Sequence, residues 1–219
     1  MNIIYEDDNL IICKKTTECV CELSQTHPSL ANEIQNKYGY AGVIHRLDMN
    51  VGGCVLYAKN KIAASKLSAM VSKNEISKEY IAVVHGKPDE DEGEFCDLLF
   101  KDSSKNKVYT VKRMRKGVKE ARLLYSLIET VPYETGVLSL VKIKLLTGRS
   151  HQIRVQFSSR KMSLVGDGKY GSKINKCSVA LWSHKLEFQN PLTNETVSAI
   201  SYPQRDTFPW CLFRCLKDE

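Results

Sequence analysis

The sequence predicts an α+β fold built on a mixed, mostly antiparallel sheet that is flanked by helices and loops. Apolar runs of strand length outnumber apolar runs with helical spacing, and the connections between them are short turns rather than helical crossovers. No glycine-rich phosphate loop follows a strand, so a nucleotide cofactor is not expected. With 219 residues, of which 42% are hydrophobic, the chain is long enough for a sizeable core.

The first part of the chain alternates strands with two helices. Residues 3–5 and 9–15 predict two short strands, and residues 28–38 predict a helix that ends before Gly39. Strand residues at 43–44 and 54–59 flank a polar turn over 45–53. Asn60 then predicts the cap of a helix whose apolar residues recur at helical spacing: Ile62, Ala63, Leu67, Met70 and Val71.

The second part is richer in strands. Residues 80–84 predict an apolar strand and 95–145 a succession of strands, in which Lys142 and Lys144 alternate with apolar residues. A helix is expected to begin near His151, because Ile153 and Phe157 then share one face. The remaining predictions are a loop over 166–171 and late strands at 180–182 and 197–200.

Composition excludes several classes of protein. No apolar stretch reaches membrane-spanning length, and the first residues lack a basic region followed by an apolar run, so we expect a cytoplasmic protein without a membrane partner. The eight cysteines form no C-x-x-C pair and have no nearby histidine pair. We therefore expect reduced thiols, several of them buried, and no metal site.

The net charge is +7, and five basic residues crowd into one short segment. We call this the basic segment; it contains Lys112, Arg113, Arg115, Lys116 and Lys119. Such a cluster could neutralise several phosphates of a nucleic acid, and it is equally typical of a solvated hairpin or loop. Charge alone leaves both interpretations open.

Three further segments place reactive groups at the ends of apolar runs. Asp48 could serve as a nucleophile, a general base or a metal ligand, although by spacing alone a turn-forming role is the better interpretation. Tyr80 has packing as its ordinary role. Arg149 and Arg154 could clamp a phosphate or pair with a carboxylate, and either alone is also typical of a surface. The residues by themselves do not identify a reaction.

Four motifs in order resemble the RluA-type pseudouridine synthases. Residues 43–48, followed by Val51-Gly52-Gly53, resemble the H-R-L-D-x-x-T-S-G signature, and Lys78-Glu79-Tyr80 resembles the second motif. Residues 147–155 are similar to T-G-R-x-H-Q-I-R, and residues 166–171 to G-D-x-x-Y-G. The chain departs from the signature where Val51-Gly52 replaces Thr-Ser, which removes two hydroxyl groups. The resemblance implies the pseudouridine synthase fold with a catalytic cleft.

The resemblance also implies roles for individual residues. Asp48 would attack the target uridine, Tyr80 would stack on the flipped base and take part in the proton step, and Arg154 would pair with the aspartate. Arg46 would enter the space that the base leaves. The residues expected to bind RNA are His45, Arg46, Arg149, His151, Lys112, Arg113 and Arg115.

These roles imply an enzyme without a cofactor that acts on RNA. A stem-loop of rRNA or tRNA is the expected substrate, since sequence-specific readers address splayed bases in loops. We expect one catalytic domain over residues 1–219, without a separate N-terminal RNA-binding domain, and a monomer. Two alternatives stay open: a catalytically impaired RNA-binding protein on the same fold, and a hydrolase using Asp48 and His151. The hydrolase would need a second carboxylate or a metal cluster, and neither is evident.

Overall fold

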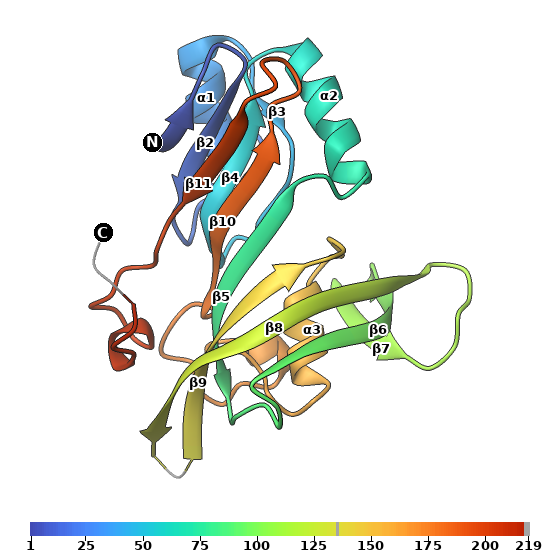
Figure 1. Cartoon of the computed structure of the whole chain (residues 1–219), viewed down its shortest axis with the longest axis vertical. Helices are drawn as coiled ribbons and strands as arrows, with labels where there is room; N and C mark the ends of the chain where they lie inside the picture. Colours follow the sequence, from blue (N-terminus) through green and yellow to red (C-terminus); the bar gives the residue numbers. More distant parts are fainter. Residues whose placement is uncertain (135, 217–219) are drawn as a thin grey trace. The chain divides into compact units, whose positions relative to one another are not determined.

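The computed structural model describes residues 1–134 and 136–216. They divide into two compact units. Unit 1 consists of Met1–Glu79 and Trp182–Pro203, and unit 2 consists of Tyr80–Leu181 and the residues from Gln204 onward. Both units are built on strands with few helices, so the predicted α+β class is confirmed (Figure 1).

Unit 1 holds a mixed sheet. Its strands are β1 (Asn2–Glu6), β2 (Leu10–Lys15), β3 (Gly42–Val43), β4 (Gly52–Ala58), β10 (Leu181–Gln189) and β11 (Thr196–Ile200). The β1/β2, β2/β4, β3/β4 and β10/β11 pairs are antiparallel, whereas β10 runs parallel to β4. The predicted strands are confirmed, but β4 begins at Gly52, within the stretch expected to be a turn.

Two helices accompany this sheet, and local signals define where they begin. Helix α1 (Leu30–Tyr38) starts at Ser29, whose hydroxyl accepts a hydrogen bond from the Asn32 amide, and ends at Gly39 in the left-handed conformation. Helix α2 (Lys61–Ser72) starts at Asn60, whose side chain accepts from the Ala63 amide at 2.9 Å. Both predicted helices are confirmed.

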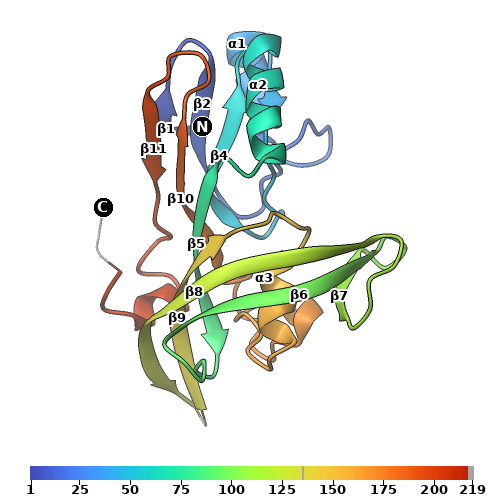
Figure 2. The same ribbon diagram turned by 45° about the vertical axis from the view of Figure 1, so that its right-hand side comes forward.

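The core of unit 1 lies between α2 and one face of the sheet (Figure 2). Leu10 and Ile12 alternate along β2 and meet Leu67 of α2 in a single buried cluster. Ala63 joins the same cluster. The expectation that Ile62 belongs to this apolar face was wrong: it is 67% exposed, because it lies one position before Ala63 and therefore about 100° around the helix.

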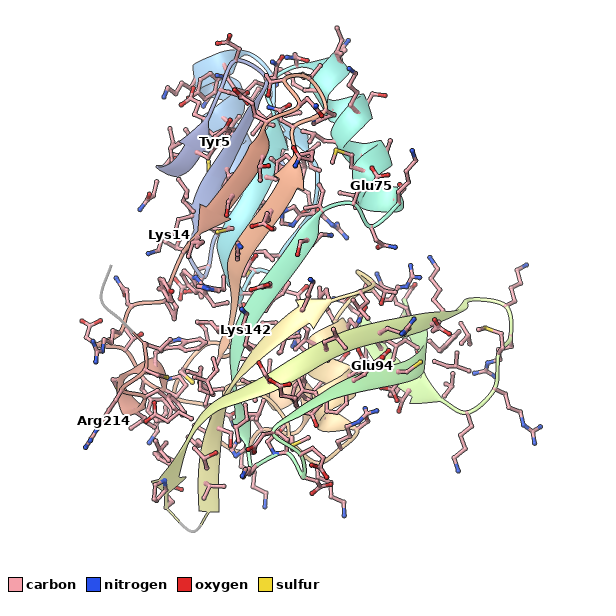
Figure 3. All side chains as sticks on the ribbon, in the orientation of Figure 1. Tyr5, Lys14, Glu75, Glu94, Lys142 and Arg214 are labelled. Carbon is pink, nitrogen blue, oxygen red and sulfur yellow. The ribbon has the colours of Figure 1, made fainter. Side chains whose placement is uncertain are left out.

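Unit 2 holds an antiparallel sheet that contains the predicted succession of strands. They are β5 (Ser77–His85, of which residues 80–85 belong to unit 2), β6 (Glu92–Asp102), β7 (Lys107–Val111), β8 (Val118–Tyr133) and β9 (Gly136–Leu145). Their order is β5-β9-β8-β6-β7. One face is polar: Lys142 of β9 and Glu94 of β6 extend from it, and Glu94 pairs with Arg122 at 2.5 Å (Figure 3).

Helix α3 (Gln152–Ser158) packs on the apolar face of this sheet. Its Phe157 ring lies 5.0 Å from the ring of Phe95 and 6.1 Å from that of Tyr125. Ile153 is also buried, so the predicted spacing of Ile153 and Phe157 is confirmed. Two single turns of 3-10 helix complete the unit, η1 (Gly168–Tyr170) and η2 (Trp210–Leu212). No helix in the described part of the chain is long and apolar enough to span a membrane.

Candidate active site

The Asp48 turn in unit 1 is held by a buried lysine. Lys15 has no exposed surface, and its ammonium group donates to the carbonyl oxygens of Asp48 at 3.3 Å, Met49 at 3.0 Å and Val51 at 2.8 Å. Burial lowers the pKa of Lys15, and negative charge nearby, including that of Asp48, opposes this shift. The Val51 amide also donates to the Asp48 carbonyl at 2.9 Å, which closes a β-turn. The backbone that carries Asp48 is therefore anchored at three carbonyl groups within four residues.

His45 enters this loop as a neutral residue. Its Nε2 atom accepts a hydrogen bond from the Leu56 amide at 3.2 Å, so that nitrogen carries no proton. Burial, assisted by the positive charge of Lys78, lowers the pKa of His45 to about 3. At neutral pH, His45 therefore ties the start of the signature to β4 as an uncharged acceptor.

Arg46 lies at the surface of the same loop. Its guanidinium pairs with Glu22, and the two side chains are 63% and 48% exposed. Exposed pairs of this kind contribute about 0–1 kcal/mol, so little free energy is needed to separate them. Arg46 can change partner at low cost.

The two glycines that follow Val51 make room for neighbours in β10. A Cβ atom on Gly52 would lie 2.2 Å from Cζ3 of Trp182, so the tryptophan ring occupies the space that a side chain would need. Gly53 has φ +116°, and a Cβ there would lie 2.2 Å from the Ser183 carbonyl oxygen. Trp182 is itself held by a hydrogen bond from Nε1 to the Ser201 hydroxyl at 3.1 Å. Val51-Gly52-Gly53 therefore fits against β10 because its two glycines carry no side chain.

In unit 2, Arg154 is held by a carboxylate that the sequence analysis did not include among the site residues. Asp167 is 1% exposed and binds the guanidinium through two hydrogen bonds, from Nε at 2.7 Å and from Nη2 at 2.8 Å. The Tyr170 ring lies beneath the same guanidinium, 5.1 Å from Cζ. The G-D-x-x-Y-G element supplies both partners. Its aspartate between two glycines was the sequence signal that could have identified them.

Tyr170 also connects Arg154 to its neighbours. Its hydroxyl lies 2.9 Å from Nδ1 of His151 and accepts the Val108 amide at 2.9 Å. His151 adopts the left-handed conformation immediately before α3. Tyr80, the first residue of unit 2, is 6% exposed on β5.

Arg149 lies in a turn that Gln152 organises. The Gln152 side-chain oxygen accepts from the Arg149 amide at 2.9 Å and from the Thr147 hydroxyl at 2.9 Å. The Arg149 Nε atom donates to the Glu120 carbonyl at 2.9 Å, so its exposed side chain runs along β8.

The basic segment spans the exposed turn between β7 and β8 and the start of β8. Lys112, Arg113 and Arg115 all lie in the turn, and Arg115 stacks its guanidinium 5.0 Å from the Phe100 ring. The segment therefore forms an exposed hairpin turn that presents these cations to solvent.

The predicted site residues are distributed over both units. His45, Arg46 and Asp48 lie together in one loop of unit 1, whereas Tyr80 and Arg154 belong to unit 2. Lys15 was missed because a lysine that follows an apolar strand is ordinarily interpreted as a surface residue. Among the described residues, no group of histidine, cysteine or acidic side chains could hold a metal ion. The cysteines are free, and Cys13, Cys19, Cys21 and Cys54 are buried.

Comparisons with known proteins agree on one family. The family model described as RNA pseudouridylate synthase matches residues 9–159, which extend across both units. The dual-specificity RNA pseudouridine synthase RluA of Pasteurella multocida is 28% identical, with 93% of each chain covered. The RNA pseudouridine synthase YjbO of Bacillus subtilis is 32% identical, with 90% of this chain and 70% of the relative covered. A Synechocystis relative is 29% identical, and the chain spans 65% of its length.

Two solved human structures share the fold. The structure titled human RNA pseudouridylate synthase domain containing 1 has a TM-score of 0.77 at 22% identity and covers 93% of this chain and 83% of its own. The structure titled domain containing 4 has a TM-score of 0.76 at 19% identity and covers 93% and 89%. The chain belongs to the RNA pseudouridylate synthase family, a class of isomerases that acts on RNA. Within that family it is of the RluA type.

The neutral state of His45 predicts an acid-sensitive fold. The unfolded protein takes up a proton on His45 as the pH falls below about 6.5, whereas the folded protein does so only near 3. Stability from the neutral imidazole is therefore complete above the unfolded pKa and is lost as the pH falls towards the folded pKa, by about 1.4 kcal/mol per pH unit. Urea denaturation at about pH 7 and about pH 5 should show a larger loss in wild type than in His45→Gln, by about 2 kcal/mol. The exposed His27→Gln variant should follow wild type, and parallel losses in all three proteins would contradict the prediction.

The contact between Gly52 and Trp182 predicts a coupled pair. Gly52→Ser, which introduces the residue of the family signature, should lower the free energy of unfolding by about 2 kcal/mol or more because the ring must move. In the Trp182→Ala background, the same change should add little further loss, so urea denaturation should reveal strong non-additivity. Gly136→Ser is the matched control, since a Cβ there meets nothing within 4 Å. Additive effects of Gly52→Ser and Trp182→Ala would refute the coupling.

Proposed function

We propose that this protein isomerises specific uridines of structured RNA to pseudouridine, with Asp48 as the nucleophile. The observation that carries the proposal is the fixed turn of Asp48 in a chain of this family. Lys15 binds the carbonyls of Asp48, Met49 and Val51, which limits how far the carboxylate can move. A nucleophile held in this way loses little conformational entropy when it attacks.

The chemistry requires a rearrangement without oxidation or reduction. The bond between N1 and C1′ of the ribose breaks, and a bond between C5 and C1′ forms. The hydrogen on C5 leaves as a proton, and N1 gains one. Asp48 would bond transiently to the target nucleotide while the base turns, and its departure restores the carboxylate. Atoms and electrons balance without a redox or nucleotide cofactor, so none is proposed.

Tyr80 and Arg154 have supporting roles in the proposal. Tyr80 would stack on the flipped base and take part in the transfer of the proton from C5. Asp167 binds the Nε and Nη2 atoms of Arg154 and so fixes the orientation of the guanidinium. We propose that Arg154, held in this orientation, pairs with the carboxylate of Asp48 during the reaction.

Base flipping would be assisted by Arg46. Unstacking a base costs a few kcal/mol, and a side chain that fills the vacated space offsets part of that cost. The exposed pair between Arg46 and Glu22 favours this role, because it can open at low cost. Arg149, His45 and His151 would contact the RNA around the target.

The substrate proposed is a stem-loop of rRNA or tRNA. The name of the Pasteurella relative describes a dual-specificity enzyme, which is compatible with either RNA. We further propose that the two units work as one catalytic domain in a cytoplasmic monomer, since the family match extends across both.

Asp48→Asn should abolish catalysis while leaving the fold intact, because the amide cannot act as the nucleophile. The measurement is tritium release from 5-tritiated uridine in cellular RNA that lacks the pseudouridines made by this protein. Wild type should release tritium, and Asp48→Asn should release none above background.

Asp8→Asn is the matched control, because it makes the same chemical change in an exposed turn of unit 1. It should retain wild-type activity. Equal release by wild type and Asp48→Asn would refute the role of Asp48. RNA binding without release in either protein would favour the catalytically impaired RNA-binding alternative.

The basic segment predicts a salt-sensitive contribution to binding. Replacing Lys112, Arg113 and Arg115 with alanine should reduce the slope of log affinity against log salt by about 2, at roughly 0.7 per lost contact with single-stranded RNA. The measurement is filter binding of the same RNA at several salt concentrations. A control with Lys61 and Lys66 of α2 and its C-cap residue Lys73 replaced removes the same charge elsewhere and should leave the slope unchanged. Equal slopes in the two triple variants would exclude a specific role for the segment.

A further inference from the structure

Unit 2 contains an open pocket that none of the roles proposed above uses. It has a volume of about 490 Å³ and lies between the edge strand β7, helix α3 and the η1 turn. Residues that define it include Lys107, Tyr109, Val155, Ser158, Lys169 and Tyr170. Pockets of about 300–1,000 Å³ suit small organic groups, so a single nucleotide fits this one by size.

The walls of the pocket offer aromatic and apolar surface. Tyr109 is 37% exposed on β7 and is one of the residues that line the pocket. Val108, Val155 and Tyr170 line the pocket too and belong to one buried apolar cluster. An exposed tyrosine at the edge of an apolar pocket can take a planar ring by stacking, and a nucleobase is the planar ring that an RNA-modifying enzyme meets.

Charge around the pocket favours an anion. Lys107 Nζ lies 5.7 Å from the centre of the Tyr109 ring and 5.4 Å from that of Tyr170, so it stands between the two aromatic walls. Lys169 lies at the rim, where its Nζ atom donates to the Asn106 carbonyl at 2.9 Å. No aspartate or glutamate is among the described residues that line the pocket. A nucleotide can stack its flat base on a tyrosine ring and place its phosphate near the lysines.

Backbone groups of β7 add hydrogen-bonding capacity. The Val108 amide donates to the Tyr170 hydroxyl and therefore points away from β6. Because peptide groups alternate along a strand, those of Thr110 point the same way, towards the pocket. Ser158 is tied to the Tyr170 carbonyl at 2.7 Å, which holds α3 and η1 together at the opposite wall.

Tyr170 links the pocket to Arg154. Tyr170 lines the pocket, and the centre of its ring lies 5.1 Å from Cζ of Arg154. Its hydroxyl is hydrogen-bonded to Nδ1 of His151. A ligand in the pocket that contacts Tyr170 would therefore contact a residue that supports Arg154, which is proposed to act in catalysis.

We propose that this pocket binds a nucleotide of the RNA substrate other than the target uridine, stacking its base on Tyr109 and placing its phosphate near Lys107. The proposal rests on the function proposed above, because it assumes an RNA substrate. It adds a second point of recognition, so that the enzyme would read an unpaired base of its substrate in addition to the target uridine.

Photochemical cross-linking tests the location directly. A short single-stranded oligo(5-iodouridine) is irradiated with the wild-type protein, and the attached peptides are mapped by mass spectrometry. We expect attachment at Tyr109 in wild type and its loss in Tyr109→Ala. Attachment confined to other residues would overturn the proposal.

Binding of poly(U) tests the contribution of the pocket. Tyr109→Ala should weaken binding about tenfold, the usual effect of removing one stacking ring. Tyr109→Phe keeps the ring and should bind as wild type does. Lys107→Ala removes a charge at the pocket, and Lys61→Ala on α2 is its control because it removes the same charge elsewhere. Thermal unfolding of each variant verifies that the fold is intact. If Tyr109→Ala binds as tightly as wild type, or if Tyr109→Phe is as weak as Tyr109→Ala, stacking at this position is excluded.

These measurements separate the pocket from the chemistry. Neither cross-linking nor affinity requires turnover, so they report on the pocket alone. Persistent tritium release by Asp48→Asn would overturn the catalytic proposal and leave the pocket unaffected. If Tyr109→Ala bound poly(U) with wild-type affinity and no cross-link formed at Tyr109, while Asp48→Asn released no tritium, only the pocket proposal would be overturned.

Discussion

A single buried ammonium group determines the shape of the loop that carries Asp48. Lys15 is removed from water entirely, which is costly for a charge unless its hydrogen bonds are satisfied. The carbonyls of Asp48, Met49 and Val51 satisfy them and are satisfied in return. Loss of Lys15 would in turn remove this donor from the buried Val51 carbonyl, which is also unfavourable. The shape of the turn therefore depends on Lys15 at the end of β2.

Unit 2 secures Arg154 by a comparable device. Packing of Phe157 against Phe95 fixes helix α3 on its sheet, and Asp167 then fixes the guanidinium along one edge. In both units a charged group is oriented by a buried partner that is distant in sequence, at 33 residues for Lys15 and Asp48 and 13 for Arg154 and Asp167. The motif around residue 166 is explained by this support: its aspartate and tyrosine hold a neighbour instead of reacting.

Sequence was sufficient for most elements and for the choice of family, because both depend on local patterns. Asn60, Ser29 and Gly39 mark helix ends through hydrogen bonds made within a few residues. The contacts of Lys15 could not be predicted, since they join a strand end to a distant turn and the residue type indicates exposure. The start of β4 at Gly52 was missed for a similar reason: two glycines favour a turn unless a neighbour such as Trp182 fills the space above them.

The tight fit of Trp182 over Gly52 makes the residues acceptable at positions 52 and 182 depend on one another. The ring in its present position leaves no space for a side chain at position 52. A side chain at position 52 would therefore displace the ring and disturb its hydrogen bond to Ser201. The structural effect of the departure from the signature depends on this pair of residues and not on position 52 alone.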